Sequence, residues 1–219
     1  MSKKQYVVIG LGRFGTSIAE TLYSLGNDVL VIDIDEERIQ NIANNVTHAI
    51  QADATDELSL REVGVRNFDV AIVSIGADIQ ASIMATILLK ELGIKLVVTK
   101  ANNAMHAKVL KKLGADKVVF PEKDMGIRVA HGLVFSNILE YIELSPDYSL
   151  AEFLTPSGWH GKTLKELNVR SNYGINVMAI KREDGVDVSP LANEVIREGD
   201  IIVAIGSIEE LNKLENNIK

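Results

Sequence analysis

The chain has 219 residues, 47% hydrophobic and 24% charged, which is an ordinary globular composition for one medium domain and a smaller one. Its net charge of −7 and the absence of any Lys/Arg cluster longer than a pair argue against a nucleic-acid partner, which would need a basic face. The lack of cysteine excludes disulfides, thiolate metal sites and a cysteine nucleophile.

Apolar runs in the sequence are short. None approaches the roughly 20 residues of a membrane-spanning helix. The first apolar run leads directly into a glycine-rich loop, which does not fit a signal peptide. We therefore expect a cytoplasmic protein that reaches a membrane only through a partner.

The first 120 residues alternate between apolar runs typical of buried strands and segments with helical spacing. Strands are predicted at 6–9, 29–32, 47–51, 70–75, 96–99 and 118–120. Helices are predicted around 18–25, 56–64, 81–92 and 103–113, and no element is predicted between Asp33 and Thr47. This alternation predicts an α/β fold with a doubly wound parallel sheet.

The pattern changes at Glu122. Residues 123–138 read as one helix, with Met125, Val129, Leu133 and Ile138 among its apolar positions. Shorter elements follow: strands near 140–144, 150–154, 175–181 and 201–205, helices near 163–167 and 208–216, and a hairpin turn at 184–185. We predict a nucleotide-binding domain over 1–122, a linking helix over 123–138 and a small α+β ligand-binding domain over 139–219.

A glycine loop, Gly10-Leu11-Gly12-Arg13-Phe14-Gly15, lies between the first strand and the first helix, as in Rossmann-type nucleotide-binding domains. Gly10 permits a tight turn, Gly12 a close approach to phosphate and Gly15 close packing of the helix. The helix N-terminus offers unpaired N–H groups to phosphates. Asp33, at the end of the next strand, suits ribose hydroxyls and would repel the 2′-phosphate of an NADP-type ligand. The alternative is a glycine turn without a ligand.

Arg13 is unusual within this loop. A cation in the first helical turn opposes the helix dipole and costs a few tenths to about 1 kcal/mol. Extra phosphate charge nearby would explain it, either the γ-phosphate of ATP or a nucleotide on a neighbouring subunit. The alternative is a solvated surface arginine.

Polar residues and a glycine follow the later strands: Asp53, Ser74, Gly76, Lys100, Asn102 and Glu122. The carboxyl ends of parallel strands meet at the edge where ligands bind. Asp53 could read adenine or ribose, and Lys100 could meet phosphate. Glu122 could hold a cation near phosphate or pair with Arg13 of another subunit. Each residue alone could also be a helix cap or a surface residue.

Catalytic patterns are weak. The histidines are scattered, with no metal-type pair: His48, His106, His131 and His160. The serines considered as nucleophiles lack the sequence context of one: Ser136, Ser157 and Ser189. A dehydrogenase normally needs an acid/base group from a second domain, where His160 is the only candidate. The nucleotide is therefore predicted to act as a signal, with an NAD(H) sensor or NAD-dependent oxidoreductase as the alternative.

Several further segments carry a family resemblance. They are Val8-Ile9 before the loop, Asp53-Ala54-Thr55-Asp56, Arg66-Asn67-Phe68-Asp69, Gln80-Ala81-Ser82, Gly114-Ala115-Asp116, Pro121-Glu122, Arg170 to Asn176 and Ser189-Pro190-Leu191. On these residues the whole chain resembles the KTN/RCK regulatory subunits of bacterial Ktr/Trk potassium transporters. The resemblance implies a non-enzymatic subunit whose dimers form an octameric ring, docked on a membrane potassium channel subunit. It also implies an RCK_N domain that binds ATP or ADP, with ATP activating.

The resemblance also implies roles for single residues. Arg13 would reach the γ-phosphate of ATP bound in the partner subunit, and Lys100 would lie near the phosphates. Glu122 would take part in a Mg or Na ion site at the dimer interface. The full nucleotide-binding set implied is Gly10, Gly12, Arg13, Phe14, Gly15, Asp33, Ile34, Asp53, Ala54, Ser74, Ile75, Gly76, Lys100 and Glu122.

The C-terminal part resembles an RCK_C domain, which in relatives binds cyclic di-AMP between two copies and inactivates the transporter. The matching positions are Leu164, Arg170, Ile175, Asn176 and Pro190. An arginine suits phosphate, an asparagine suits an adenine edge and apolar side chains suit the faces of the bases. Two alternatives stay open: Arg170 pairs with an acidic neighbour, or the chain is a cyclic dinucleotide receptor whose N-terminal fold is vestigial.

Overall fold

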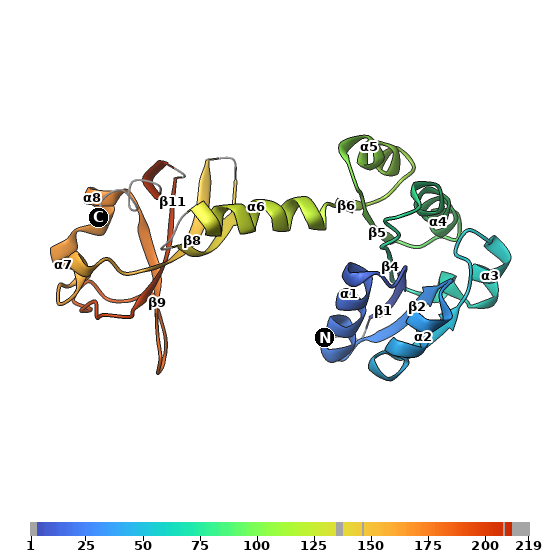
Figure 1. Cartoon of the computed structure of the whole chain (residues 1–219), viewed down its shortest axis with the longest axis horizontal. Helices are drawn as coiled ribbons and strands as arrows, with labels where there is room; N and C mark the ends of the chain where they lie inside the picture. The colour runs from blue at the N-terminus through green and yellow to red at the C-terminus, as the bar shows by residue number, and fades with distance from the viewer. Residues whose placement is uncertain (1–3, 135–137, 146, 208, 212–219) are drawn as a thin grey trace. The chain divides into compact units, whose positions relative to one another are not determined.

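The structure is a computed structural model of the chain, and it describes residues 4–134, 138–145, 147–207 and 209–211 (Figure 1). Two compact units make up the chain, 1–122 and 123–219, called here the N-unit and the C-unit. Within the described ranges, no helix combines the length and the apolar character needed to cross a membrane.

The N-unit is built on a six-stranded, entirely parallel sheet with the order β3-β2-β1-β4-β5-β6 (Figure 1). Its strands are β1 (Gln5–Ile9), β2 (Asp28–Asp33), β3 (His48–Gln51), β4 (Val70–Val73), β5 (Leu96–Lys100) and β6 (Lys117–Val119). The order reverses between β1 and β4, which is the switch point where doubly wound sheets bind ligands. The predicted doubly wound parallel sheet is confirmed.

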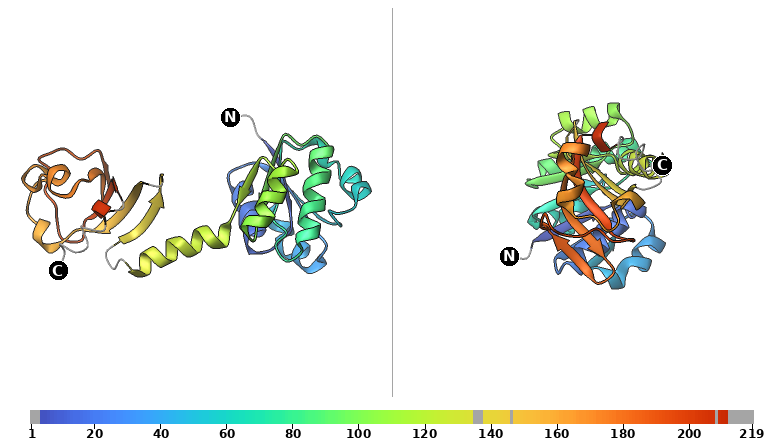
Figure 2. Two further views of the ribbon diagram at one scale, coloured as in Figure 1. Left: turned by 90° about the horizontal axis from the view of Figure 1, so that it is seen from above. Right: turned by 90° about the vertical axis from the view of Figure 1, so that its left-hand side faces the viewer.

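Helices cover both faces of this sheet (Figure 2). One face carries α1 (Arg13–Ser24) and α2 (Glu36–Ile42), and the other carries α3 (Glu57–Glu62), α4 (Ile79–Glu91) and α5 (Ala104–Lys112). Two short 3-10 helices, η1 (Ala43–Asn45) and η2 (Val65–Asn67), complete the connections. Successive residues of β1 face opposite sides, so Val8 packs with α1 and α2 while Val7 packs with α3 and α4.

Two sequence predictions need correction. The helix α2 was not predicted, because its seven residues bury only Ile39 and Ile42 and give little periodic signal. The helix expected over 123–138 is α6 (Pro121–Val134), because proline is well tolerated in the first turn of a helix. Ile138, expected at an apolar position of that helix, instead begins a strand.

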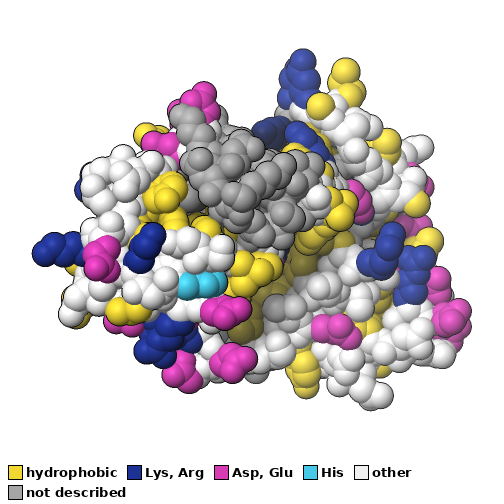
Figure 3. All heavy atoms as spheres, turned by 60° about the vertical axis from the view of Figure 1, so that its left-hand side comes forward, with side chains coloured by type: hydrophobic (Ala, Val, Ile, Leu, Met, Phe, Trp, Pro, Cys, Tyr) yellow, Lys and Arg dark blue, Asp and Glu magenta, His cyan; other side chains and the backbone are white. Residues whose placement is uncertain are grey.

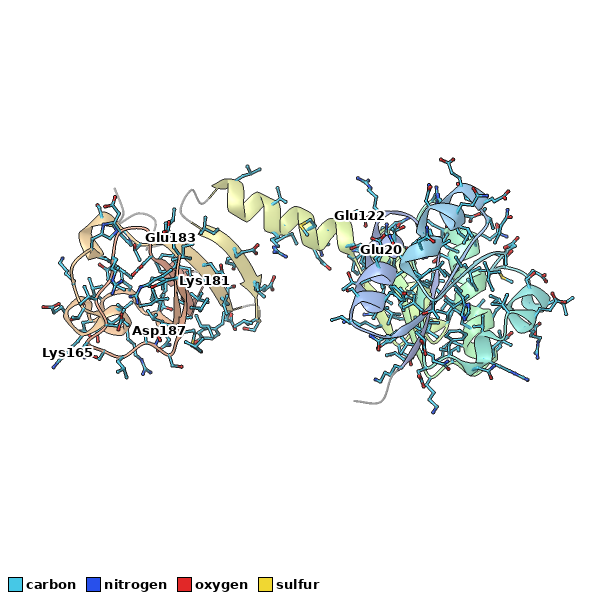
Figure 4. All side chains as sticks on the ribbon, turned by 90° about the horizontal axis from the view of Figure 1, so that it is seen from below. Glu20, Glu122, Lys165, Lys181, Glu183 and Asp187 are labelled. Carbon is cyan, nitrogen blue, oxygen red and sulfur yellow. The ribbon has the colours of Figure 1, made fainter. Side chains whose placement is uncertain are left out.

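The C-unit contains a five-stranded antiparallel sheet with the order β10-β9-β11-β8-β7. Its strands are β7 (Ile138–Glu143), β8 (Tyr148–Leu154), β9 (Asn176–Arg182), β10 (Gly185–Val188) and β11 (Ile201–Ser207). The predicted hairpin turn is confirmed, since Arg182 pairs with Gly185; Figure 4 labels Lys181, Glu183 and Asp187 on this hairpin.

Short helical segments pack on this sheet: η3 (Ser157–Trp159), α7 (Leu164–Leu167) and α8 (Val169–Tyr173). The core centres on Trp159, whose ring lies edge-on to Phe153 at 6.0 Å and tilted against Tyr173 at 5.1 Å. The helix α8 was not predicted. Most of the helix predicted near 208–216 lies outside the described residues.

Candidate functional site

A cavity of about 700 Å³ opens at the carboxyl edge of the N-unit sheet, which is a size typical of sites for small ligands. The predicted residues that line it are Gly10, Gly12, Asp33, Ile34, Asp53, Ala54, Ser74, Ile75, Gly76 and Lys100. The structure therefore brings together residues from the ends of β1, β2, β3, β4 and β5. Arg13, Phe14, Gly15 and Glu122 are not among the lining residues.

The glycines of the loop have distinct steric surroundings. Gly10 has φ +92°, a conformation that side chains disfavour. A Cβ on Gly15 would lie 2.0 Å from the Gly10 carbonyl oxygen, so only glycine lets α1 pack this closely. A Cβ on Gly12 would meet nothing within 4 Å. The space beside Gly12 is therefore open to a ligand.

The helix α1 begins directly at this loop. Its N-cap is Gly12, which provides no side-chain cap, and no acidic residue lies in its first turn. The first N–H groups of a helix lack intrahelical partners and favour anions. Arg13, the first residue of α1, is exposed, and Phe14 is half-buried.

Asp33 links two segments of the site. Its carboxylate is buried, with Oδ2 accepting from the Leu11 N–H at 2.5 Å and Oδ1 accepting from the Asp35 N–H at 2.9 Å. These bonds hold the glycine loop against the end of β2. Sequence reasoning assigned Asp33 to ribose; the structure adds that the same carboxylate shapes the phosphate loop.

Asp53 is exposed, and its Oδ1 accepts from the Thr55 N–H at 2.8 Å and the Thr55 hydroxyl at 2.7 Å. Its neighbour Ala54 is buried in the core beneath the sheet edge. The short turn therefore fixes the Asp53 carboxylate at the rim of the cavity.

Ser74 directly follows β4, and 5% of its surface is exposed. The residue lines the cavity, but its hydroxyl oxygen is buried beside Gly15 and has no hydrogen-bond partner among the described residues. A buried polar group without a partner is rare in folded proteins. The close approach of the hydroxyl to Gly15 is a further reason why this position of α1 requires glycine.

Lys100 and Glu122 form an ion pair beside the Gly76 loop of the cavity, with Nζ and Oε1 2.5 Å apart. Glu122 lies in the first turn of α6 (Figure 4). The hydrogen bond from Lys100 lowers the pKa of Glu122, with smaller contributions from the charges of Lys100 and Arg13. Beside this pair, the Asn102 amide donates to the Gly76 carbonyl and connects the loops after β5 and β4.

Charge is divided along the cavity. Asp33, Asp35 and Asp53 line the part next to β2 and β3, with Arg38 beside them. Lys100 lines the other part, next to the loop of Gly76, where the Asp78 carboxylate accepts from the Ala81 N–H as the N-cap of α4. A ligand with a neutral polar end and a phosphate end therefore has one favoured orientation, with its phosphates near Lys100.

Sequence reasoning placed Asn102 at this edge but did not assign several other lining residues to the site: Asp35, Arg38, Thr55, Ala77, Asp78 and Ala81. The sequence signal that could have identified Arg38 is its position three residues after Asp35. The Asp35 side chain caps α2 by accepting from the Glu37 and Arg38 N–H groups. Without α2, the side chain of Arg38 could not be placed.

The candidate metal-ligating and catalytic side chains are dispersed over the described residues. No group of three or more His, Asp or Glu side chains there is arranged to hold a metal ion. Burial lowers the pKa of His106, whose Nδ1 faces the Asn102 N–H at 3.5 Å. His160 contacts Thr155, and the side chain of His131 lies outside the description. On the face drawn in Figure 3, basic and acidic side chains are interspersed.

In the C-unit, the residues matched to a cyclic di-AMP site have different surroundings. Arg170 and Asn176 are exposed, whereas Leu164 and Pro190 are half-buried. Ile175 is fully buried in the core beside Trp159, so its side chain is not open to a ligand. No acidic side chain among the described residues pairs with Arg170.

Comparisons with known proteins agree with this architecture. The TrkA-N domain model matches residues 6–121 and the TrkA-C domain model matches residues 150–219. The Ktr system potassium uptake protein C of Bacillus subtilis is 49% identical over 99% of this chain and 98% of its own length. The Ktr system potassium uptake protein A of the same organism is 45% identical, over 99% and 97%.

Solved structures support the fold. The crystal structure of the GsuK RCK domain matches with a TM-score of 0.68 and 17% identity, covering 99% of this chain and 48% of that one. The GsuK channel bound to NAD matches with a TM-score of 0.55 and 23% identity, covering 100% of this chain and 39% of that one. From its two domains and its whole-length relatives, the chain belongs to the KTN/RCK-domain regulatory subunits of Ktr/Trk potassium transporters.

Proposed function

We propose that the N-unit cavity binds ATP and ADP and that the chain uses the difference between them to regulate potassium uptake. The observation that carries this proposal is the division of charge along the cavity, with Asp33, Asp35 and Asp53 at one part and the ammonium of Lys100 at the other, where Asp78 is engaged as a helix cap. The open space beside Gly12 and the uncapped N-terminus of α1 support a phosphate chain between them.

In this proposal Asp33 and Asp53 hold the ribose and adenine, and Lys100 and the start of α1 hold the phosphates. Arg13 is exposed at the beginning of α1, which supports a contact with the γ-phosphate of a nucleotide bound in a partner subunit. ADP lacks that phosphate. ATP and ADP would then differ in their affinity for two states of the assembly, which is what a ligand-driven switch requires.

Glu122 would join a Mg or Na ion site where two copies of the chain meet. Such a cation needs several oxygen ligands, and one carboxylate provides two at most. The remaining oxygens would come from the partner copy and the nucleotide phosphates. The proposed assembly is a ring of eight chains, built from dimers, on the cytoplasmic side of a membrane potassium channel subunit. No chemical reaction is required of the chain.

The direct experiment is to purify the full chain, denature it and identify any released nucleotide by mass spectrometry. Titrations of nucleotide-free protein with ATP, ADP and NADH then give the affinities. Binding of ATP and ADP in preference to NADH supports the proposal. Tightly bound NAD alone, without measurable ATP binding, would favour the alternative NAD(H) sensor or oxidoreductase.

For the C-unit, we propose binding of cyclic di-AMP as an inhibitory signal. The exposed Arg170 guanidinium, without an acidic partner among the described residues, is suited to a phosphate. Calorimetry of the full chain with cyclic di-AMP should show binding that Arg170→Ala abolishes and that Lys165→Ala, a neighbouring exposed cation on α7, leaves intact. An absence of heat with the unmodified chain would count against this ligand.

A further inference from the structure

Arg38 lines the N-unit cavity close to the carboxylate assigned to ribose. It lies in the first turn of α2, and its guanidinium is 3.2 Å from Asp35 Oδ2 and 3.7 Å from Asp33 Oδ2. Both carboxylates are themselves fixed by backbone N–H groups. The Arg38 guanidinium is therefore oriented at the rim of the cavity before any ligand arrives.

Two negative charges neutralise this arginine. A nucleotide phosphate at the same place would have to compete with Asp33 and Asp35, and the net local charge of the three side chains is negative. Charge alone therefore gives Arg38 little attraction for phosphate. What remains is the planar face of the guanidinium, which stacks on aromatic rings.

We infer that Arg38 lines the part of the cavity that receives the adenine base and that its guanidinium stacks on the face of the adenine ring. This inference rests on the proposed binding of adenine nucleotides. The base attached to a ribose held by Asp33 projects only a few ångströms from it, within reach of Arg38. Ile34, 69% exposed on the same rim, adds apolar surface for the ring.

The stacking makes a specific prediction about which ligands depend on Arg38. ATP, ADP and NADH share the adenosine end, so they should lose affinity equally. Contacts between a cation and an aromatic face contribute about 0.5–2 kcal/mol, so Arg38→Ala should weaken binding of each by roughly 2- to 30-fold. The ratio of ATP to ADP affinity should not change, because Arg38 lies away from the phosphates.

The experiment compares Arg38→Ala, Arg38→Lys and Arg61→Ala by calorimetry with ADP, ATP and NADH. Arg61 is the matched control, since it is an equally exposed arginine in an ion pair with Glu57 on α3 and does not line the cavity. Circular dichroism and thermal unfolding of the nucleotide-free variants verify that each is folded.

Arg38→Lys separates stacking from charge, because lysine keeps the charge beside Asp33 and lacks the planar face. Loss of affinity in both Arg38 variants, equal for ADP, ATP and NADH and absent in Arg61→Ala, supports the inference. Full affinity in Arg38→Lys, or in Arg38→Ala, overturns it. If the unmodified chain binds no adenine nucleotide, the proposed function fails instead, so the two failures are distinct.

Discussion

The ammonium of Lys100 lies 2.5 Å from the carboxylate of Glu122, which joins the end of β5 to the first turn of α6. Lys100 is well buried, with 13% of its side chain exposed, while Glu122 is 68% exposed. Lys100 also lines the N-unit cavity. In the proposed complex, Glu122 and a nucleotide phosphate would therefore share one cation.

If Lys100 is shared in this way, substitutions of Lys100 and of Glu122 should have opposite effects on nucleotide affinity. Lys100→Met should weaken binding of both ADP and ATP by about 10-fold or more, because a charge-assisted bond to phosphate is lost. In the presence of a metal chelator, Glu122→Gln should strengthen binding a few-fold, because Lys100 is no longer neutralised. Calorimetry measures both. Weaker ADP binding by Glu122→Gln without metal would contradict the shared role of Lys100.

The ion pair also predicts a pH dependence. Lys100 lowers the pKa of Glu122 from its usual 4.5, so the pair stabilises the fold above that value and the stabilisation is lost as the pH falls through the depressed pKa. The difference in unfolding free energy between the unmodified chain and Lys100→Met should therefore shrink in acid. Urea unfolding at a series of pH values measures it, and a difference that grows in acid would refute the assignment.

Gly12 and Gly15 provide a matched pair of substitutions. Gly15→Ala places a Cβ 2.0 Å from the Gly10 carbonyl oxygen, so α1 must shift and the melting temperature should fall. Gly12→Ala meets no protein atom within 4 Å, so the fold should persist while nucleotide binding weakens. Thermal unfolding and calorimetry separate the two effects. Undiminished ATP and ADP affinity in Gly12→Ala would show that phosphates do not approach this residue.

Arg13→Ala should preserve ADP binding and reduce the preference for ATP. The loss expected for one charge-assisted contact with the γ-phosphate is about 1.5–3 kcal/mol, or roughly 10- to 150-fold in ATP affinity. Transport measured with the channel subunit should lose most of its ATP activation. The control is Arg66→Ala, which removes an exposed arginine on η2. If the Arg13→Ala variant keeps the ATP activation of the unmodified protein, Arg13 does not distinguish ATP from ADP.

The sequence was sufficient for the sheet of the N-unit because its strands are continuous apolar runs, as in Val29 to Ile32, and because glycines and aspartates mark their ends. It was not sufficient for α2, whose seven residues contain more polar than buried positions. Arg38 was missed for that reason. Its relation to Asp33 depends on the turn of a helix that the pattern did not reveal.

The burial of Ile175 has a different cause. Its neighbour Asn176 is exposed, and the two adjacent residues differ because Ile175 turns into the core below Trp159 just before β9 begins. A family match assigns both residues to one site without distinguishing their directions. Adjacent residues of an extended chain point to opposite sides, and the chain becomes extended here after Gly174, with φ +74°, ends α8.

Glu122 is the second residue of a 14-residue helix. Negative side chains near the N-terminus of a helix are stabilising. In the proposed complex, a phosphate that takes Lys100 would leave the Glu122 carboxylate at the start of α6 free to bind a cation.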